Sequence, residues 1–211
     1  MSDPWGLEGA TVAITGASTG IGAALTDAFL DSGAIVLGIS RSPDKHPTTS
    51  PNYRTYAADL SVRSETEALI DTLKADHERI DVLINNAGHA LRAPSVDYPM
   101  DDWDRLIELN LTAPFLLSRG LPPPMWQPGA GKVIFTASLW SFLGGRSVPA
   151  YTVTKSGIAG MIRALSNEWA PQGVQVNGIA PGYIDTDLTR PALHDPEIGP
   201  AFLSRIPAGR W

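Results

Sequence analysis

The chain has 211 residues, and its 43% hydrophobic and 18% charged residues are the composition of one globular domain with a single core. Its formal net charge of −6 at pH 7 argues against a nucleic-acid partner, and no basic run suggests contact with a membrane surface. The sequence has no cysteine, which excludes disulfides, thiolate catalysis and cysteine-based metal sites.

The sequence shows no targeting or membrane segment. Residues 1–6 contain neither a basic nor an apolar stretch, so we expect no signal peptide. No apolar run approaches the ~20 residues that a membrane span needs. Together with the lack of cysteine, these features predict a cytoplasmic protein without a metal centre.

Short apolar runs alternate with helical patterns along the chain. They predict strands at residues 11–15, 35–39, 53–58, 82–85, 132–136 and 174–179. Helices are expected at residues 24–30, 64–77, 101–117 and 149–169, with a short one near 198–203. Because the strands are continuously apolar, the sheet should be parallel and covered on both faces. We therefore expect residues 1–211 to form a single α/β domain with a doubly wound parallel sheet.

Local signals set several helix ends. Ser64 and Glu67 have the spacing of a capping box, which predicts the start of a helix. Pro149 suits the first turn of the next-to-last predicted helix. Gly120 and the prolines at 122–124 should stop the helix before them, because proline lacks an amide donor and clashes with the preceding turn.

Tyr151 and Lys155 carry the main chemical signal. In a helix, residues four apart share a face, so the Lys155 ammonium would lie beside the Tyr151 phenol. A free phenol has a pKa of about 10, which a neighbouring cation lowers toward neutral pH. Ser138 could hydrogen-bond the same substrate oxygen, giving a device that moves a proton to or from an alcohol or carbonyl. An amphipathic helix with a surface lysine shows the same spacing, so this interpretation depends on the other motifs.

The turn after the first strand contains Gly16, Gly20 and Gly22. Glycines let the backbone approach a pyrophosphate, and the following helix N-terminus offers free amides and the positive end of its dipole. The spacing is a variant of the common G-x-G-x-x-G pattern. A plain glycine turn between strand and helix is the alternative.

Polar residues also end two later strands. Residues 85–88, Asn-Asn-Ala-Gly, lie at the carboxyl edge of the predicted sheet, where ligands bind in open α/β folds. Asp59 could accept a hydrogen bond from an adenine amino group, although a lone Asp at a strand end is more often a turn residue.

As a set, these motifs resemble the short-chain dehydrogenase/reductase family over nearly the whole chain. The matching positions are residues 15–22, Asp59-Leu60, residues 85–88, Asn110, Ser138, Tyr151, Lys155 and Pro181-Gly182. The resemblance implies a Rossmann fold, a nicotinamide cofactor and four cooperating catalytic residues.

The resemblance also implies a role for each site residue. Tyr151 would be the general acid/base, and Ser138 would orient the reacting oxygen. Lys155 would lower the Tyr151 pKa and bind the nicotinamide ribose, and Asn110 would hold a water in a proton relay. Thr186 would contact the carboxamide. The implied cofactor-binding residues are Gly16, Ser18, Thr19, Gly20, Ile21, Gly22, Ser40, Arg41, Asp59, Leu60, Asn86, Ala87, Gly88, Tyr151, Lys155, Pro181, Gly182, Ile184 and Thr186.

Within the family, the chain is similar to the 2-dehydro-3-deoxy-D-gluconate or 2-deoxy-D-gluconate dehydrogenase branch. The similarity lies in residues 141–145, 148–151, 167–170, 179–183 and 205–211. It implies NAD(P)-dependent hydride transfer between a secondary alcohol and a ketone, on a sugar acid or related polyol. A catalytically silent dinucleotide-binding sensor or scaffold is the alternative function.

A carboxylate substrate needs a cation. Arg92 and Arg146 follow segments that should border the pocket, and Arg92 is the better candidate. The predicted substrate residues are therefore Arg92, Ser138, Arg146 and Tyr151. Both arginines could instead be solvated surface residues.

Two features depart from the family pattern. Family members usually continue through another helix and a final strand, so the chain is C-terminally short relative to the family. The missing part would supply an edge strand and part of a subunit interface. The proline triplet at 122–124 is also unusual, because the family continues a helix there.

The end of the second strand predicts the cofactor preference. An acidic residue there favours NAD, whereas an arginine attracts the 2′-phosphate of NADP. The chain has Ser40-Arg41 and no acid, although Thr19 leaves the glycine turn without a second basic residue and the sugar-acid branch often uses NAD. We expect NADP or NAD, with a modest preference for NADP. Arg41 as a simple loop residue is the alternative.

The helix at 150–169 is apolar around much of its circumference. One side should face the sheet, and the remainder needs another cover. The family resemblance implies a homodimer or homotetramer that is built on such helices.

Overall fold

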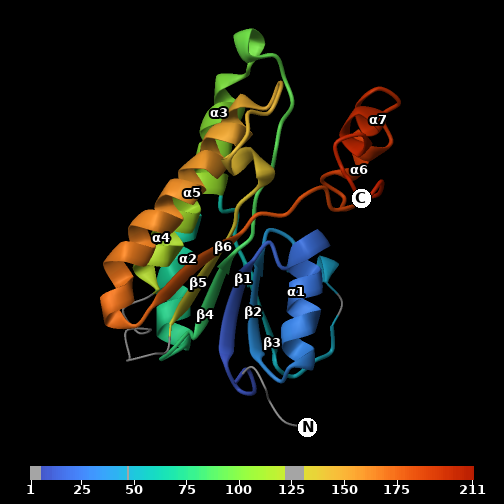
Figure 1. Ribbon diagram of the computed structural model, residues 1–211. Coiled ribbons are helices and arrows are strands. Elements are labelled where there is room, and N and C mark those ends of the chain that lie inside the picture. Colours follow the sequence, from blue (N-terminus) through green and yellow to red (C-terminus); the bar gives the residue numbers. More distant parts are fainter. Residues whose placement is uncertain (1–5, 47, 122–130) are drawn as a thin grey trace.

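The computed structural model describes residues 6–46, 48–121 and 131–211 (Figure 1). The proline triplet at 122–124 therefore lies outside the described residues. Within them, one six-stranded sheet has the order β3-β2-β1-β4-β5-β6, and every neighbouring pair is parallel. The strands are β1 (Thr11–Thr15), β2 (Ile35–Ser40), β3 (Tyr53–Ala57), β4 (Val82–Asn85), β5 (Lys132–Thr136) and β6 (Gln175–Ile179). This confirms the predicted doubly wound parallel fold.

Helices connect the strands, and two more follow the last one. They are α1 (Gly20–Asp31), α2 (Arg63–Asp76), α3 (Met100–Ile107), α4 (Ala113–Gly120), α5 (Pro149–Trp169), α6 (Arg190–Leu193) and α7 (Ile198–Leu203). Short 3₁₀ turns are η1 (Pro43–Lys45), η2 (Ser95–Asp97), η5 (Leu139–Ser141) and η6 (Ala170–Gln172). Pro149 occupies the first turn of α5, as predicted.

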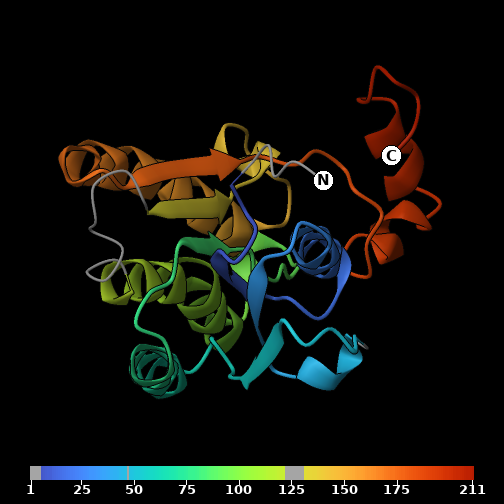
Figure 2. The ribbon, with the colours of Figure 1, turned by 90° about the horizontal axis from the view of Figure 1, so that it is seen from below.

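Alternate strand residues serve two separate cores. Val12 and Ile14 of β1 point to the face covered by α1, where partly buried α1 side chains such as Phe29 pack against them. Ala13 of β1 lies in the other core, with Leu117 of α4 among its members. Figures 1 and 2 show α1 on one side of the sheet and α2, α4 and α5 on the other. Burial on both faces explains why the inner strands β1, β2 and β4 lack a polar alternation, whereas the edge strands β3 and β6 are more exposed.

The helix predicted over 101–117 is interrupted. A π-helical turn, η3 (Glu108–Thr112), separates α3 from α4 and carries the buried Asn110. Such turns are rare and occur frequently at functional sites. The spacing of apolar residues in the sequence does not reveal a π-helical turn, because its one extra residue shifts the apolar face of the helix only locally.

The predicted capping box is wrong. Helix α2 begins at Arg63 with Val62 at the N-cap, so Ser64 lies inside the helix. The Val62 amide donates to the Asp59 carbonyl at 2.9 Å, and this turn sets the start of the helix. The sequence prediction also missed α6, a single turn of four residues. No helix among the described residues is long and apolar enough to cross a membrane.

Candidate active site

The glycine-rich turn between β1 and α1 has no space for side chains at its key positions. Gly16 and Gly20 have φ values of +68° and +54°, a region that favours glycine. A Cβ on Gly22 would stand 1.9 Å from the Gly16 carbonyl oxygen. The turn delivers the chain to the N-terminus of α1, where free amides suit a phosphate group.

Thr15 locks this turn to the end of β4. Its hydroxyl accepts hydrogen bonds from the backbone amides of Asn86 and Ala87, both at 2.9 Å. The Asn86 side chain returns a bond to the Thr15 carbonyl at 3.1 Å and accepts one from the Thr136 hydroxyl at 3.2 Å. The ends of three parallel strands thus form one rigid wall. Thr15 belongs to the motif on which the resemblance rests, but the sequence prediction gave it no role.

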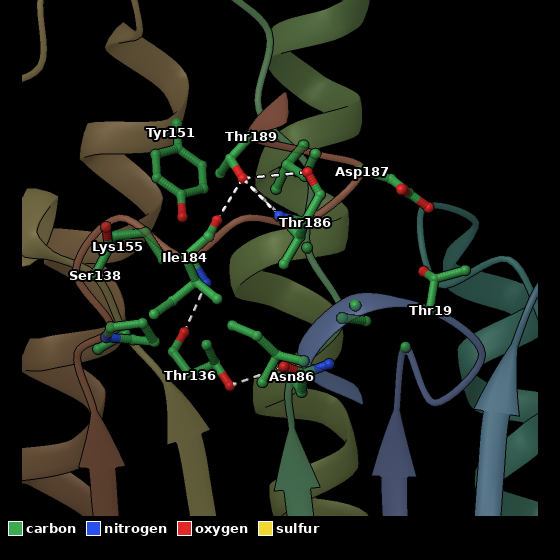
Figure 3. Close-up of a pocket in the computed structure, with 18 of the residues that line it drawn as sticks. Thr19, Asn86, Thr136, Ser138, Tyr151, Lys155, Ile184, Thr186, Asp187 and Thr189 are labelled. Carbon is green, nitrogen blue, oxygen red and sulfur yellow. Dashed lines mark hydrogen bonds between the residues drawn. The ribbon is translucent and has the colours of Figure 1, made fainter. Parts of the chain in front are cut away.

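Tyr151, Ser138 and Lys155 meet at the carboxyl edge of the sheet. Ser138 is the N-cap of η5, and its hydroxyl accepts from the Trp140 amide at 3.3 Å. The Ser138 hydroxyl also lowers the pKa of the Tyr151 phenol. The Lys155 Nζ lies 5.6 Å from the centre of the Tyr151 ring. Figure 3 shows Tyr151 on one side of the pocket and Thr19 of the glycine turn across from it.

Lys155 is only 4% exposed, and its ammonium donates to the Thr136 carbonyl at 2.6 Å. Burial lowers the pKa of Lys155 to about 8. Burial also raises the pKa of Tyr151, and the Ser138 hydrogen bond offsets this rise only in part. Burial therefore dominates the phenol pKa in this structure, because loss of solvent disfavours the phenolate, and the lowering expected from Lys155 stays a prediction.

Asn110 is fully engaged with the backbone behind the site. Its Oδ1 accepts from the His89 amide at 3.0 Å, and its Nδ2 donates to the His89 carbonyl at 2.8 Å and to the Thr154 hydroxyl at 3.3 Å. A Cβ on Gly88 would lie 3.3 Å from the Asn110 Oδ1 and 3.7 Å from the Lys155 Nζ. Asn110 thus fixes the chain after β4, and it lines none of the three cavities described next.

Three adjoining cavities follow the carboxyl edge, and neighbouring cavities share lining residues. The predicted residues that line the middle one are Gly16, Thr19, Gly20, Ile21, Asn86, Ala87, Gly88, Ser138, Tyr151, Lys155, Pro181, Gly182, Ile184 and Thr186. Ser18, Ser40, Arg41, Asp59 and Leu60 line the outer cavity. Of the predicted cofactor residues, only Gly22 lines neither, because it supports the turn from behind.

The outer cavity contains a second cation that the sequence prediction missed. Lys45, from η1, lines it together with Arg41. Asp59 accepts from the Ser61 amide at 2.9 Å and from its hydroxyl at 2.6 Å. Burial alone would raise the pKa of Asp59, but the Ser61 hydrogen bonds and the charges of Arg41 and Arg105 lower it overall. The cavity therefore combines two cations with an ionised carboxylate.

The third cavity, of about 380 Å³, lies beside Ser138 and Tyr151, and Arg92 lines it. Arg146, the other predicted substrate residue, does not line this cavity, so the structure does not bring its side chain to Arg92, Ser138 and Tyr151. Its carbonyl instead accepts a hydrogen bond from the Arg92 guanidinium at 3.1 Å. A volume of this order suits a small organic ligand.

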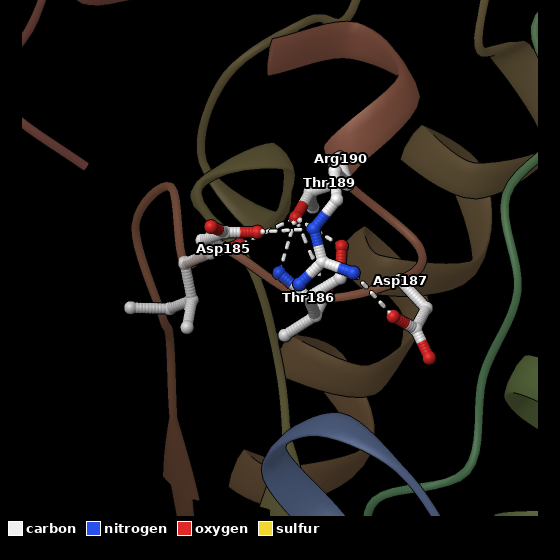
Figure 4. A network of polar contacts seen from close by, with 6 residues as sticks. Asp185, Thr186, Asp187, Thr189 and Arg190 are labelled. Carbon is white, nitrogen blue, oxygen red and sulfur yellow. Dashed lines mark hydrogen bonds and ion pairs between the residues drawn. The ribbon is translucent and has the colours of Figure 1, made fainter. Parts of the chain in front are cut away.

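The segment after β6 closes the middle cavity. The Thr189 hydroxyl accepts from the Thr186 amide at 3.0 Å, and Arg190 is paired with Asp185 at 3.1 Å and with Asp187 at 2.6 Å (Figure 4). The two ion pairs and the threonine bonds hold Thr186 against the cavity.

Among the described residues, no cluster of three or more His, Cys, Asp or Glu side chains could hold a metal ion.

Gly22→Ala should weaken dinucleotide binding on the order of 10- to 100-fold, because overpacking costs ~1–3 kcal/mol and the added methyl must displace the Gly16 carbonyl. Titration with NADPH, followed by fluorescence, measures the effect. Gly160→Ala is the matched control, since its Cβ would approach only the Arg163 guanidinium, at 3.9 Å. Normal binding by Gly22→Ala would contradict the assignment of the turn.

Lys155→Met should change how stability depends on pH. The pKa of Lys155 is lower in the folded protein, about 8, than its ordinary value of 10.5. Below pH 8 both states carry the charge, and burying it costs about 3 kcal/mol. Above pH 10.5 neither state carries it. The free energy of unfolding of the wild type relative to Lys155→Met should therefore rise between these pH values. Urea unfolding at pH 8 and at pH 10.5 measures this change. The same difference in free energy of unfolding between the two proteins at both pH values would contradict the prediction.

Comparisons with known proteins agree with this geometry. Residues 10–197 match the family described as short chain dehydrogenase. The chain is 42% identical to 2-dehydro-3-deoxy-D-gluconate 5-dehydrogenase of Pseudoalteromonas atlantica, over 100% of the chain and 86% of the relative. The corresponding protein of Bacillus subtilis is 38% identical over 100% of the chain and 85% of its own length.

Solved structures give the same result. A putative NAD(P)-dependent gluconate 5-dehydrogenase from Beutenbergia cavernae with bound NADP superposes with a TM-score of 0.91 at 37% identity, covering 99% of this chain and 86% of that one. A gluconate 5-dehydrogenase from Burkholderia cenocepacia in complex with NADP and tartrate has a TM-score of 0.88 at 31% identity, with coverages of 97% and 83%. The chain thus belongs to the short-chain dehydrogenase family and is an NAD(P)-dependent oxidoreductase.

Proposed function

We propose that the protein interconverts a secondary alcohol and a ketone on a sugar acid. The observation that carries this proposal is the position of Tyr151 and Ser138, which line both the middle cavity and the cavity that contains Arg92. The reacting carbon of a substrate in the Arg92 cavity would thus lie between these hydroxyls and the nicotinamide. The relatives named above for gluconate derivatives support the sugar acid as substrate.

The dinucleotide would occupy the outer and middle cavities, and when bound it supplies or accepts the hydride. The glycine turn and the α1 N-terminus fit its pyrophosphate, because the glycines carry no side chain that would screen the free backbone amides. Asp59 and Leu60 would border the adenosine end. Pro181, Gly182, Ile184 and Thr186 would cover the nicotinamide end.

Tyr151 would transfer the proton on the substrate oxygen, and the Ser138 hydroxyl would hold that oxygen in place. The buried Lys155 ammonium would supply positive charge next to the forming phenolate. That charge matters more once a phenolate develops than it does for the neutral phenol. Asn110 would keep the backbone around His89 in position, and its role in holding a water of the proton relay stays a prediction.

Arg92 is the proposed partner of the substrate carboxylate. Its guanidinium is held by the Arg146 carbonyl and lies 5.7 Å from the centre of the Phe202 ring. An arginine that is fixed in this way suits a carboxylate, because less side-chain entropy is lost on binding. Turnover of a panel of sugar acids and matching neutral polyols tests the proposal. Cofactor binding without turnover of any member would instead favour the silent sensor, which the comparisons do not support.

Tyr151→Phe should reduce kcat by ~10²-fold or more, because it keeps the ring and removes the atom that transfers the proton. Steady-state rates with the best panel substrate measure this effect. The Kd for NADPH should stay near the wild-type value, which separates loss of chemistry from loss of binding. Near-normal turnover would remove Tyr151 from the proposed role.

We also propose a preference for NADP over NAD. Arg41 and Lys45 line the outer cavity, where the adenosine ribose would lie, and each can pair with a 2′-phosphate. No acidic residue occupies position 40 or 41 to accept the ribose hydroxyls of NAD. The second cation, which the glycine turn lacks, is supplied by η1 instead.

Arg41→Ala should weaken NADP binding ~10- to 100-fold and NAD binding much less, since a charge-assisted contact is worth ~1.5–3 kcal/mol. Parallel titrations with both cofactors measure the difference. Arg54→Ala, an exposed arginine on β3 outside the cavities, is the control. Equal weakening of both cofactors, or tighter binding of NAD by the wild type, would contradict the preference.

The protein should form a homodimer or homotetramer through α4 and α5. Ile158, Leu165 and Trp169 of α5 face the sheet core, but Val153 of α5 is 46% exposed and Phe115 of α4 is 39% exposed. Covering such side chains favours association. Sedimentation velocity at micromolar concentration should show a dimer or tetramer, and Val153→Asp should shift it toward monomer. A wild-type monomer would contradict this proposal.

We retain the prediction of a cytoplasmic location, which the absence of cysteine supports.

A further inference from the structure

Trp211 forms part of the wall of the substrate cavity. It lines the same cavity as Arg92, Ser138 and Tyr151, although it lies 60 residues beyond Tyr151 in the sequence. Tyr183, Phe202 and Trp211 line this cavity from three separate segments that follow β6. Trp211 therefore reaches the cavity only through the path of the chain beyond the sheet.

An aromatic cluster holds the indole in place. The ring centres of Trp211 and Tyr183 are 5.2 Å apart, and those of Trp211 and Phe202 are 6.3 Å apart. Tyr183 and Phe202 stack on each other at 4.8 Å. Arg92 lies over the Phe202 ring, so the indole and the guanidinium are supported by the same cluster. This packing fixes the orientation of both groups before a ligand arrives.

The indole nitrogen of Trp211 is shielded from solvent and has no hydrogen-bond partner among the described residues. Asn85 Oδ1 shares this property, but Asn85 lines none of the three cavities, and the shielded His46 Nε2 lies 3.2 Å from an Asp27 carboxylate oxygen. A shielded donor without an acceptor is costly in a folded protein. An indole N–H can only donate, so the missing partner must be an acceptor such as an oxygen.

Asp195 is the carboxylate that lines the same cavity, and its Oδ1 is already occupied. That oxygen accepts from the backbone amides of Glu197 and Ile198 at 2.9 and 2.8 Å, next to the start of α7. The charge of Arg92 contributes to the lowering of the Asp195 pKa, after these two backbone hydrogen bonds. Oδ1 of Asp195 is thus occupied by the start of α7, and Arg92 acts on this carboxylate through its charge.

We propose that Trp211 is a specificity-determining residue whose indole N–H donates a hydrogen bond to an oxygen of the bound sugar acid. Arg92 recognises the acid by its charge, and Trp211 adds a donor at a fixed position. A substrate with several oxygens satisfies both groups, whereas a simple apolar alcohol leaves the indole unpaired. This inference rests on the proposed function, because it takes the Arg92 cavity as the substrate site.

The test compares Trp211→Phe with the wild type on the panel of sugar acids and polyols, under saturating NADPH or NADP. KM for the preferred substrate should rise ~3- to 10-fold with little change in kcat, because one neutral hydrogen bond to the substrate is lost in ground state and transition state alike. Replacing Trp211 by 3-benzothienylalanine, which keeps the bicyclic shape and lacks the N–H, should give the same rise. Trp103→Phe, a partly buried indole outside the cavities, is the matched control.

The outcomes separate this inference from the proposed function. Wild-type turnover of neutral alcohols but not of sugar acids would contradict the proposed substrate, and Trp211→Phe would still be tested on the alcohol that reacts. A benzothienyl variant with wild-type KM would overturn the hydrogen bond and leave Trp211 a packing residue. If Trp211→Phe also lowered the NADPH affinity and the melting temperature, the rise in KM would be assigned to a folding defect, and the hydrogen bond would be overturned.

Discussion

A buried ammonium controls the geometry of this active site. The buried Lys155 ammonium donates to the Thr136 carbonyl at the end of β5, and this bond ties α5 to the carboxyl edge of the sheet. The Ser141 hydroxyl fixes the same turn by donating to the Lys155 carbonyl at 2.7 Å. Burying this charge opposes folding, and a cost of this kind is typical of a site where charge must be ready before the reaction begins.

The cofactor side of the site depends on strand ends that are tied together. Thr15, Asn86 and Thr136 come from three adjacent strands, and their side chains bond across the carboxyl edge. The glycine turn rests against this wall, as the 3.0 Å approach of a hypothetical Gly16 Cβ to the Ala87 Cα shows. Pyrophosphate recognition and catalysis therefore share one rigid support, which is the advantage of building a site where parallel strands end.

The substrate side is assembled differently. Arg92, Tyr183, Phe202 and Trp211 lie on loops and short helices, and they are held by aromatic contacts and one guanidinium–carbonyl bond. Loops carried by a rigid scaffold are where related enzymes can change specificity without disturbing the fold.

The sequence by itself determined the strands, the glycine turn, the helix with Tyr151 and Lys155, and the family. These depend on local patterns: continuous apolar runs, glycines where no side chain fits, and a four-residue helical spacing. Only the tertiary structure decided the raised pKa of Tyr151, the π turn at Asn110, the exposure of Arg146, and the presence of Lys45 and Trp211 in the cavities. Burial, and contacts between residues far apart in the chain, arise when the sheet and the following segments pack together, and no local pattern records them.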